Sequence, residues 1–162
     1  PDEAEKYCAF LQRNGLVDYT VSDDTDCLTF GCERILKTGI QGNIVEFNLS
    51  EVLDSFKMNM DQFIDFCILS GCDYCPYVPQ VGSITAFNII SKTKTMETFL
   101  ENCKYNIPQD FDYKTARGLF INFDYPQNEP FTKTPINCKG LESFLKERDF
   151  KEIFISRIIK KM

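Results

Sequence analysis

The chain has 162 residues, of which 43% are hydrophobic, so it is long enough for one domain, or a large part of one, with a substantial core. Its formal net charge of −6 disfavours nucleic-acid binding through bulk charge, so a basic surface for DNA would have to be local or be supplied by another segment. No apolar run approaches the roughly 18 residues that a membrane-spanning helix requires, which argues against a membrane partner.

The first predicted element is a helix over residues 3–14. Its spacing places Ala4, Cys8 and Leu11 on one face, which we expect to be buried. Gly15 follows directly and is typical of the position just after the end of a helix.

Three strands are expected next. Residues 16–21 form a short, β-branched and apolar run, which predicts a buried strand that ends directly before an acidic loop. Residues 34–38 and 44–49 predict two further strands, and the two glycines between them indicate a hairpin. Ligand sites of open α/β sheets lie at the carboxyl ends of strands, so the loop after residue 21 is a candidate site.

The remaining predicted elements are helices, with an irregular loop around residues 126–135. Ser50 and Asn59 are the expected N-caps of the first two helices, and Gly71 ends the second. The second helix is expected to bury Phe63, Ile64, Cys67 and Ile68. The later helices are expected over residues 84–92, 95–103, 114–121, 141–147 and 150–161.

The eight cysteines leave two alternatives open. An even number is typical of disulfides in a secreted protein, but the spacing is irregular, and Cys8, Cys27 and Cys67 lie within apolar stretches. We therefore expect reduced, buried thiols in an intracellular protein. Cys72-x-x-Cys75 is also typical of a zinc or redox pair, but zinc needs further soft ligands and the chain has no histidine, so we predict a structural pair.

Acidic residues gather at three predicted element boundaries. They are Glu3 and Glu5 at the start of the chain, Asp24 and Asp26 behind the first strand, and Asp73 after the helix that ends at Gly71. Each cluster alone has an ordinary explanation, namely the first turn of a helix, a solvated turn or a loop cap. The three together are far more specific. Oxygen ligands without histidine suit Mg²⁺ or Mn²⁺, and two such ions close together clamp a phosphodiester and activate a water.

At these motifs the chain resembles the flap endonucleases, which are structure-specific 5′ nucleases of the XPG type. The matching stretches are Pro-Asp-Glu-Ala-Glu at residues 1–5, Asp-Thr-Asp-Cys-Leu-Thr-Phe-Gly at 24–31 and Cys-Ile-Leu-Ser-Gly-Cys-Asp-Tyr-Cys at 67–75. The closing run, residues 141–161, is similar to the family's end-of-core helices. The resemblance implies an α/β fold, with the second half of a PIN-like nuclease core over residues 1–75. A helix–two-turn–helix and C-terminal helical region is implied over residues 76–162.

The resemblance also implies a site for two Mg²⁺ ions, or Mn²⁺, held by seven carboxylates. Five of these positions match, namely Glu3, Glu5, Asp24, Asp26 and Asp73. The other two, with the family's catalytic Lys and Arg, belong to an N-terminal region that this chain lacks, so we expect the chain to be a fragment. The implied activity is hydrolysis of branched DNA with a 5′ flap in replication or repair, in the nucleus if the cell is eukaryotic. A sliding-clamp partner stays open, since the chain carries no clamp motif.

A turn that departs from the family pattern follows Asp73. In the family it reads Gly-hydrophobic-Gly-Pro-Lys-Arg-Ala and holds the DNA duplex backbone and a K⁺ ion. Here the DNA-binding positions are Gln80, Val81, Gly82 and Ser83, and the two basic residues are replaced by Ile84 and Thr85. Backbone contacts to phosphate are expected to survive at the helix N-terminus, with weaker duplex affinity.

Two other function classes remain open on the sequence. The first is a catalytically incomplete, nuclease-derived module that binds DNA or another partner, which the missing ligands and the altered turn favour. The retention of Asp24, Asp26 and Asp73 argues against it. The second is an acidic structural domain with no nucleic-acid partner.

Overall fold

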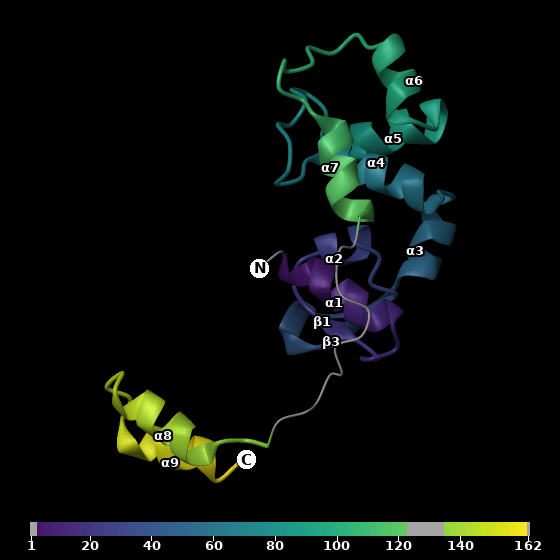
Figure 1. Cartoon of the computed structure of the whole chain (residues 1–162). Coiled ribbons are helices and arrows are strands. Elements are labelled where there is room, and N and C mark those ends of the chain that lie inside the picture. Colours follow the sequence, from purple (N-terminus) through teal and green to yellow (C-terminus); the bar gives the residue numbers. More distant parts are fainter. Residues whose placement is uncertain (1–2, 123–134, 162) are drawn as a thin grey trace. The chain divides into compact units, whose positions relative to one another are not determined.

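The computed structural model describes residues 3–122 and 135–161 (Figure 1). It divides into two compact units, Pro1–Pro126 and Gln127–Met162, and each is described here by itself. The predicted irregular loop around Pro126 and Pro130 lies outside the described residues. The expected division into residues 1–75 and 76–162 stays a prediction. Within the described ranges, no helix combines the length and apolar character needed to cross a bilayer.

The first helix, α1 (Ala4–Arg13), is confirmed, but its buried face differs from the prediction. The buried residues are Lys6, Ala9 and Gln12, whereas Ala4 is exposed and the other two predicted members are half-buried. The helix gives way to Gly15, whose φ of +66° lies in the left-handed region that favours glycine.

Gln12 gives the physical reason for the different face of α1. Its carboxamide nitrogen donates to the carbonyls of Asp18 at 3.0 Å and Arg34 at 2.9 Å, and its oxygen accepts from the Arg34 amide at 3.1 Å. A buried polar side chain is tolerated when it is hydrogen-bonded in this way. Gln12 thus fastens α1 to the first residue of the central strand.

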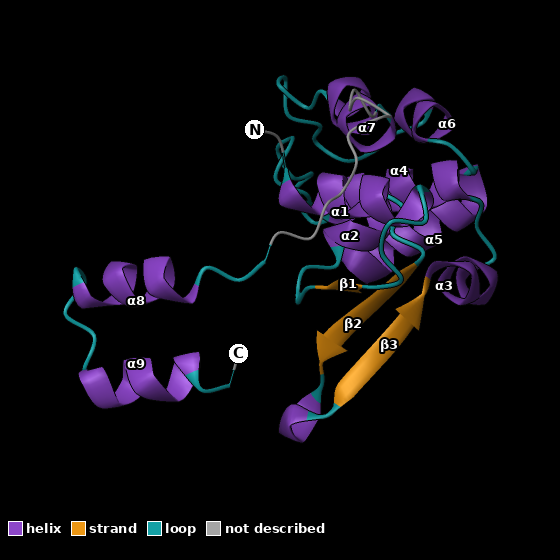
Figure 2. Ribbon diagram, turned by 60° about the horizontal axis from the view of Figure 1, so that its bottom comes forward, coloured by secondary structure: helices purple, strands orange, loops and turns teal. Residues whose placement is uncertain are grey.

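The sheet has the order β1-β2-β3, with β1 (Thr20–Val21), β2 (Arg34–Thr38) and β3 (Ile44–Asn48). β1 runs parallel to β2, and β3 runs antiparallel to β2. The hairpin prediction is confirmed, with a 3₁₀ turn at Ile40–Gly42. Figure 2 shows α1 and the short helix α2 (Asp26–Thr29) on the sheet, and both contact strands.

The predicted strand over residues 16–21 is confirmed only at its last two residues. Thr20 is buried, but Val21 is 79% exposed and Leu16 is 44% exposed. β1 pairs with β2 alone, so its outer edge and one side of Val21 have no strand to pack against in the described residues. Burial of a strand needs neighbours on both sides, which the local sequence does not show.

Two helices follow the sheet, α3 (Leu49–Phe56) and α4 (Met60–Ser70). The predicted cap of α3 is wrong, since the Asn48 side chain accepts from the Ser50 amide and takes the N-cap position. The predicted cap of α4 is right: Asn59 and Gln62 form a reciprocal capping box.

Three further helices pack with α4 to complete the first unit. They are α5 (Ser83–Thr93), α6 (Met96–Glu101) and α7 (Tyr113–Ile121). α4 contacts both α5 and α7, and α5 contacts α6. Aromatic rings join these helices to the sheet region, because Phe120 of α7 lies 4.8 Å from Phe30 and 5.2 Å from Tyr74 between ring centroids.

A buried carboxylate links α4, α6 and α7. Asp65 is 3% exposed, and its Oδ1 accepts from Arg117 Nε at 2.9 Å and Nη2 at 2.7 Å, while its Oδ2 accepts from the Met96 amide at 2.9 Å. Arg117 also donates to Glu97 at 2.8 Å. Burial raises the pKa of Asp65, and the bonds from Met96 and Arg117 oppose that shift. Burial of this charge is offset by full hydrogen bonding.

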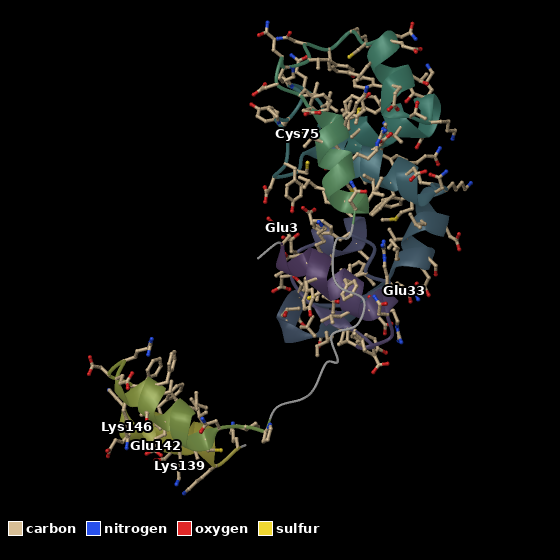
Figure 3. All side chains as sticks on the ribbon, viewed as in Figure 1. Glu3, Glu33, Cys75, Lys139, Glu142 and Lys146 are labelled. Atoms are coloured by element: carbon tan, nitrogen blue, oxygen red, sulfur yellow. The ribbon has the colours of Figure 1, made fainter. Side chains whose placement is uncertain are left out.

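The second unit is a pair of helices, α8 (Cys138–Lys146) and α9 (Glu152–Ile159), which contact each other. Leu145 and Ile155 are its buried residues. Figure 3 labels Lys146 and Glu142 on α8, which form an exposed ion pair at 2.8 Å. Both helices confirm the predicted ones within a few residues.

Replacing Asp65 by Ala should destabilise the first unit by about 2–4 kcal/mol, because the Met96 amide loses its acceptor and Arg117 loses its buried partner and keeps only the bonds to Glu97. Urea unfolding followed by circular dichroism measures this. Glu46→Ala is the control, since Glu46 and its partner Arg34 are each 41% exposed and such pairs contribute little. Equal losses of unfolding free energy in the Asp65→Ala and Glu46→Ala variants would contradict the assigned role of Asp65.

Glu97 should make the free energy of unfolding depend on pH under acidic conditions. The bond from Arg117 holds its pKa at about 2, below the ordinary 4.5. The unfolded chain therefore takes up this proton at higher pH than the folded chain, so the stabilisation is complete above pH 4.5 and is lost as the pH falls towards 2. The stability difference between the native chain and Glu97→Gln should shrink over that window. A difference that stays constant, as expected for the exposed Glu101→Gln control, would exclude this role.

Candidate metal centre

The first two predicted site residues lie at the start of α1. Glu3 occupies the N-cap position with extended backbone and is exposed, and Glu5 lies in the first turn and is half-buried (Figure 3 labels Glu3). Carboxylates are stabilised at a helix N-terminus by the positive end of the dipole. Their position therefore has a structural reason as well as the predicted functional one.

The second pair follows β1 on a loop that hydrogen bonds hold in place. The Ser22 hydroxyl accepts from the Asp24 amide at 3.0 Å, and Asp24 Oδ1 accepts from the Asp26 amide at 2.9 Å. Asp23 Oδ1 accepts from the Thr38 amide of β2 at 3.1 Å. Asp26 then begins α2 and is half-buried, whereas Asp24 is exposed.

The fifth residue, Asp73, lies in a tight turn after α4. Gly71 ends α4 with a φ of +115°, and Cys72 and Cys75 pair as an isolated antiparallel bridge on either side of Asp73. The two sulfurs are 4.0 Å apart, and all eight cysteines are free thiols. Burial raises the pKa of Cys75 to about 12.

The pKa of Asp26 reflects its burial and the charges of the other four candidate carboxylates. Its pKa is raised to about 6, first by burial and then by the negative charges of Asp24, Asp73, Glu5 and Glu3, in that order. Residues from three separate segments therefore act on one carboxylate. Such mutual repulsion is typical of a cluster that lacks its counter-ion.

The arrangement stops short of a formed coordination shell. Within residues 3–122 and 135–161, no three His, Cys, Asp or Glu side chains stand close enough together to hold a metal ion. The donor set nevertheless suits Mg²⁺ or Mn²⁺, because it consists of carboxylate oxygens. The nearby Cys67 thiol is unsuitable as a ligand, since burial and then the Asp26 charge raise its pKa to about 12.

Tyr74 is a site neighbour that the sequence did not reveal. Burial raises the pKa of its hydroxyl, and so do the charges of Glu3, Asp26, Asp73 and Glu5. Its ring packs against Phe30 and Phe120, which fixes the turn that carries Asp73. The only sequence signal is its position beside Asp73.

A cavity of about 610 Å³ opens next to Asp26, between α2, β3, α3 and α4. Its walls are largely apolar and include Phe56, Phe63 and Phe66. The Ser70 hydroxyl, which also lines it, is buried without a hydrogen-bond partner in the described part of the chain. Asp26 therefore stands between the carboxylate cluster and this cavity.

The candidate DNA-binding turn lies directly before α5. Gln80 has a φ of +68°, Val81 is buried, and Gly82 is the N-cap of α5. Gly82, Ser83 and Ile84 are exposed, and no side chain caps this helix. The first amides of α5 thus point to an open surface, where anions are favoured.

Comparison with known proteins agrees with these features. The family model described as the XPG I-region matches residues 1–73, which contain all five carboxylates. The chain is 39% identical over 172 residues to flap endonuclease 1-A of Sorghum bicolor, covering 100% of this chain and 45% of the relative. It is 42% identical over 161 residues to flap endonuclease 1 of Brugia malayi, covering 94% of this chain and 40% of the relative. The chain thus spans less than half the length of these relatives.

Solved structures share the fold. The catalytic core of Rad2 in complex with DNA substrate matches with a TM-score of 0.79 at 20% identity, over 99% of this chain and 62% of that one. Flap endonuclease-1 from Methanococcus jannaschii matches with a TM-score of 0.73 at 21% identity, over 98% and 50%. The predicted fold, a partial α/β nuclease core followed by a helical region, is confirmed by these matches. Residues 1–73 thus match the XPG I-region family, and the chain as a whole is similar to flap endonucleases.

Proposed function

We propose that the protein to which this chain belongs is a metal-dependent, structure-specific 5′ nuclease that hydrolyses phosphodiester bonds of DNA carrying a 5′ flap. The proposal is carried by Asp26, whose pKa is raised to about 6 by its burial and by the charges of the other four carboxylates. A cluster of this kind is unfavourable without cations and suits an ion-binding role. The relatives named as flap endonucleases point to the same substrate class.

Each carboxylate has a proposed role. Glu3, Asp24, Asp26 and Asp73 would hold one Mg²⁺ ion, and Glu5 would face a second. The bound ions would supply activation of a water and stabilisation of the leaving oxygen. Asp26 binds in its ionised form, because its negative charge is what attracts the cation. None of the five acts as a nucleophile, since hydrolysis proceeds by in-line attack of water.

The complete site needs more than this chain in our proposal. The relatives are more than twice as long as the matched region, and the family resemblance implies two further carboxylates and basic residues outside it. Those basic groups would stabilise the charge that develops on the phosphate. The whole protein's cleavage activity is therefore what we propose, with this chain supplying five ligands.

The turn at residues 80–83 would hold the DNA backbone. The exposed amides at the start of α5 would donate hydrogen bonds to a phosphate, and a K⁺ ion at this turn follows from the family resemblance. A solved GEN-1 structure of the same fold, with a TM-score of 0.64 and 18% identity, is described as binding with potassium. Ile84 is 81% exposed where the family has a basic residue, so cationic contacts are lost and duplex affinity is lower.

A nuclease-derived binding module without catalysis is the second candidate. It is favoured by the lack of a formed coordination shell in the described ranges and by the exposed Ile84. Such a module would bind DNA or another partner, whereas the nuclease would bind DNA, and in either case a eukaryotic protein would act in the nucleus. Cleavage assays separate the two.

Divalent metal should stabilise the chain. Removing carboxylate repulsion through Mg²⁺ or Mn²⁺ binding favours the folded state by mass action, so the melting temperature should rise at millimolar metal. Asp26→Asn should raise the melting temperature of the metal-free protein by a few degrees, since about 1 kcal/mol gives a shift of roughly 2–8 °C, and should reduce the shift with metal. Asp61→Asn, on the exposed first turn of α4, is the control. A metal shift that Asp26→Asn leaves intact would argue against this site.

The full-length protein should cleave a labelled 5′-flap DNA with Mg²⁺, whereas this chain alone should be inefficient. Loss of a single charge-stabilising group typically costs about 10² to 10³ in rate, and several would be missing here. Asp24→Ala and Asp73→Ala should abolish cleavage by the full-length protein, and Asp61→Ala should not.

Three results would change this picture. Strong cleavage by the 162-residue chain would refute the need for the remaining part. Full activity in Asp73→Ala would remove Asp73 from the site. No cleavage by the full-length protein, together with retained flap binding, would favour the module without catalysis.

A further inference from the structure

We infer that Cys72 and Cys75 form a reversible disulfide that locks the turn carrying Asp73, which makes this turn a site of oxidative modification. The formation of the disulfide stands on the geometry of the two cysteines alone. Its effect on cleavage rests on the proposed function of Asp73.

The backbone around the pair already matches disulfide geometry. Cys72 and Cys75 are partners in an antiparallel bridge, and the Cα atoms of such partners lie roughly 4.5–5.5 Å apart. Disulfides connect Cα atoms separated by about 4.4–6.8 Å. Their sulfurs are 4.0 Å apart, so closing to the bond length of about 2.05 Å requires a movement of about 2 Å. Side-chain rotation with a small adjustment of the turn provides it.

Solvent exposure distinguishes Cys72 and Cys75 from the other close pair of thiols, Cys27 and Cys32. Cys72 and Cys75 are both half-buried, on an exposed turn that includes Asp73 and Gly71. Cys27 and Cys32 share a side-chain hydrogen bond but are each 0% exposed, so an oxidant does not reach them in the folded chain. Figure 3 labels Cys75 on the loop beside α7.

Cys103 provides a matched single thiol. It is half-buried like the pair, but its sulfur contacts the backbone of Tyr105 rather than another cysteine. It can take up an adduct from a disulfide oxidant but has no adjacent thiol to resolve it.

The oxidant is a small-molecule disulfide such as oxidised glutathione. The thiolate of one cysteine attacks a sulfur of the oxidant, forming a mixed disulfide and releasing one glutathione thiolate. The second cysteine loses its proton and attacks the protein sulfur of the mixed disulfide, which releases the second glutathione. The two protein thiols give up two electrons and two protons, and one glutathione disulfide becomes two glutathione thiols.

The bond constrains the position of Asp73. In the reduced chain the turn is held by the backbone bridge between Cys72 and Cys75 and by the packing of the Tyr74 ring. The disulfide would in addition close residues 72–75, which include Asp73, into a covalent loop. A shift of about 1 Å at a catalytic position costs about 10² in rate. Oxidation should therefore lower cleavage by at least about tenfold, and reduction with dithiothreitol should restore it.

The bond itself is tested by mass spectrometry on the folded full-length protein equilibrated in glutathione redox buffers. After trapping with iodoacetamide, the peptide that contains Cys72 and Cys75 should be unalkylated under oxidising conditions. Its mass should be lower than that of the reduced, unalkylated peptide by two hydrogen atoms. It should be doubly alkylated under reducing conditions. Cys75→Ser should instead leave a glutathione adduct on Cys72, and Cys103→Ser should leave the disulfide unchanged.

Two results would overturn the disulfide, namely full alkylation of both residues across all buffers or a bond to a different cysteine. The cleavage arm uses the double variant Cys72→Ser with Cys75→Ser, which can form neither the disulfide nor an adduct at this turn and should keep its activity in oxidising buffer while the native protein loses it. Unchanged cleavage by a protein with the verified disulfide would overturn the regulatory effect. Absence of cleavage in both redox states would count against the proposed nuclease, and the mass measurement would still decide the disulfide.

Discussion

Mutual repulsion among carboxylates is the constraint on which the candidate site depends. Asp26 is half-buried and has the charges of four other carboxylates acting on it, which raises its pKa to about 6. Glu3, Asp24 and Asp73 are exposed, but their charges and that of Glu5 act on the half-buried Asp26. These residues belong to the start of α1, the loop after β1 and the turn after α4, so the surrounding structure must hold three separate segments against this repulsion.

Hydrogen bonds and ring packing next to the site hold two of these segments in place. The loop after β1 is fastened to β2 by the Asp23–Thr38 bond and to itself by the Ser22 hydroxyl. The turn after α4 is fastened by the Tyr74 ring against Phe120 of α7. Each of these anchors uses a neighbour of a site carboxylate rather than the carboxylate itself. The proposed ligands share an acidic pattern that can be recognised in the sequence. The residues that anchor them share no such pattern, so they were not predicted.

The sequence predicted most elements because helix and strand periods are local signals. The Asn59 cap and the hairpin between β2 and β3 required only a few neighbouring residues to recognise. The errors arose where distant residues decide. Gln12 is buried because the carbonyl of Arg34 lies beside it. Asp65, for which no burial was predicted, is buried because Arg117, 52 positions away in the sequence, donates hydrogen bonds to it. The short β1 likewise reflects which strands are available to pair, which its own apolar run does not encode.

The site residues were predictable in identity but only partly in geometry. Their types and spacing pointed to oxygen ligands for a hard cation, and the charge convergence at Asp26 agrees with that pattern. The turn before α5 shows the opposite case, in which the sequence departs from the family while the backbone keeps a special conformation. Gln80 takes a φ of +68° where the family has glycine. A non-glycine residue with such a left-handed φ is destabilised by about 1 kcal/mol. The backbone conformation at Gln80 therefore has a cost in the stability of the fold. Because the neighbouring Ile84 has no charge, the backbone amides of α5 are the main feature left there to attract a phosphate.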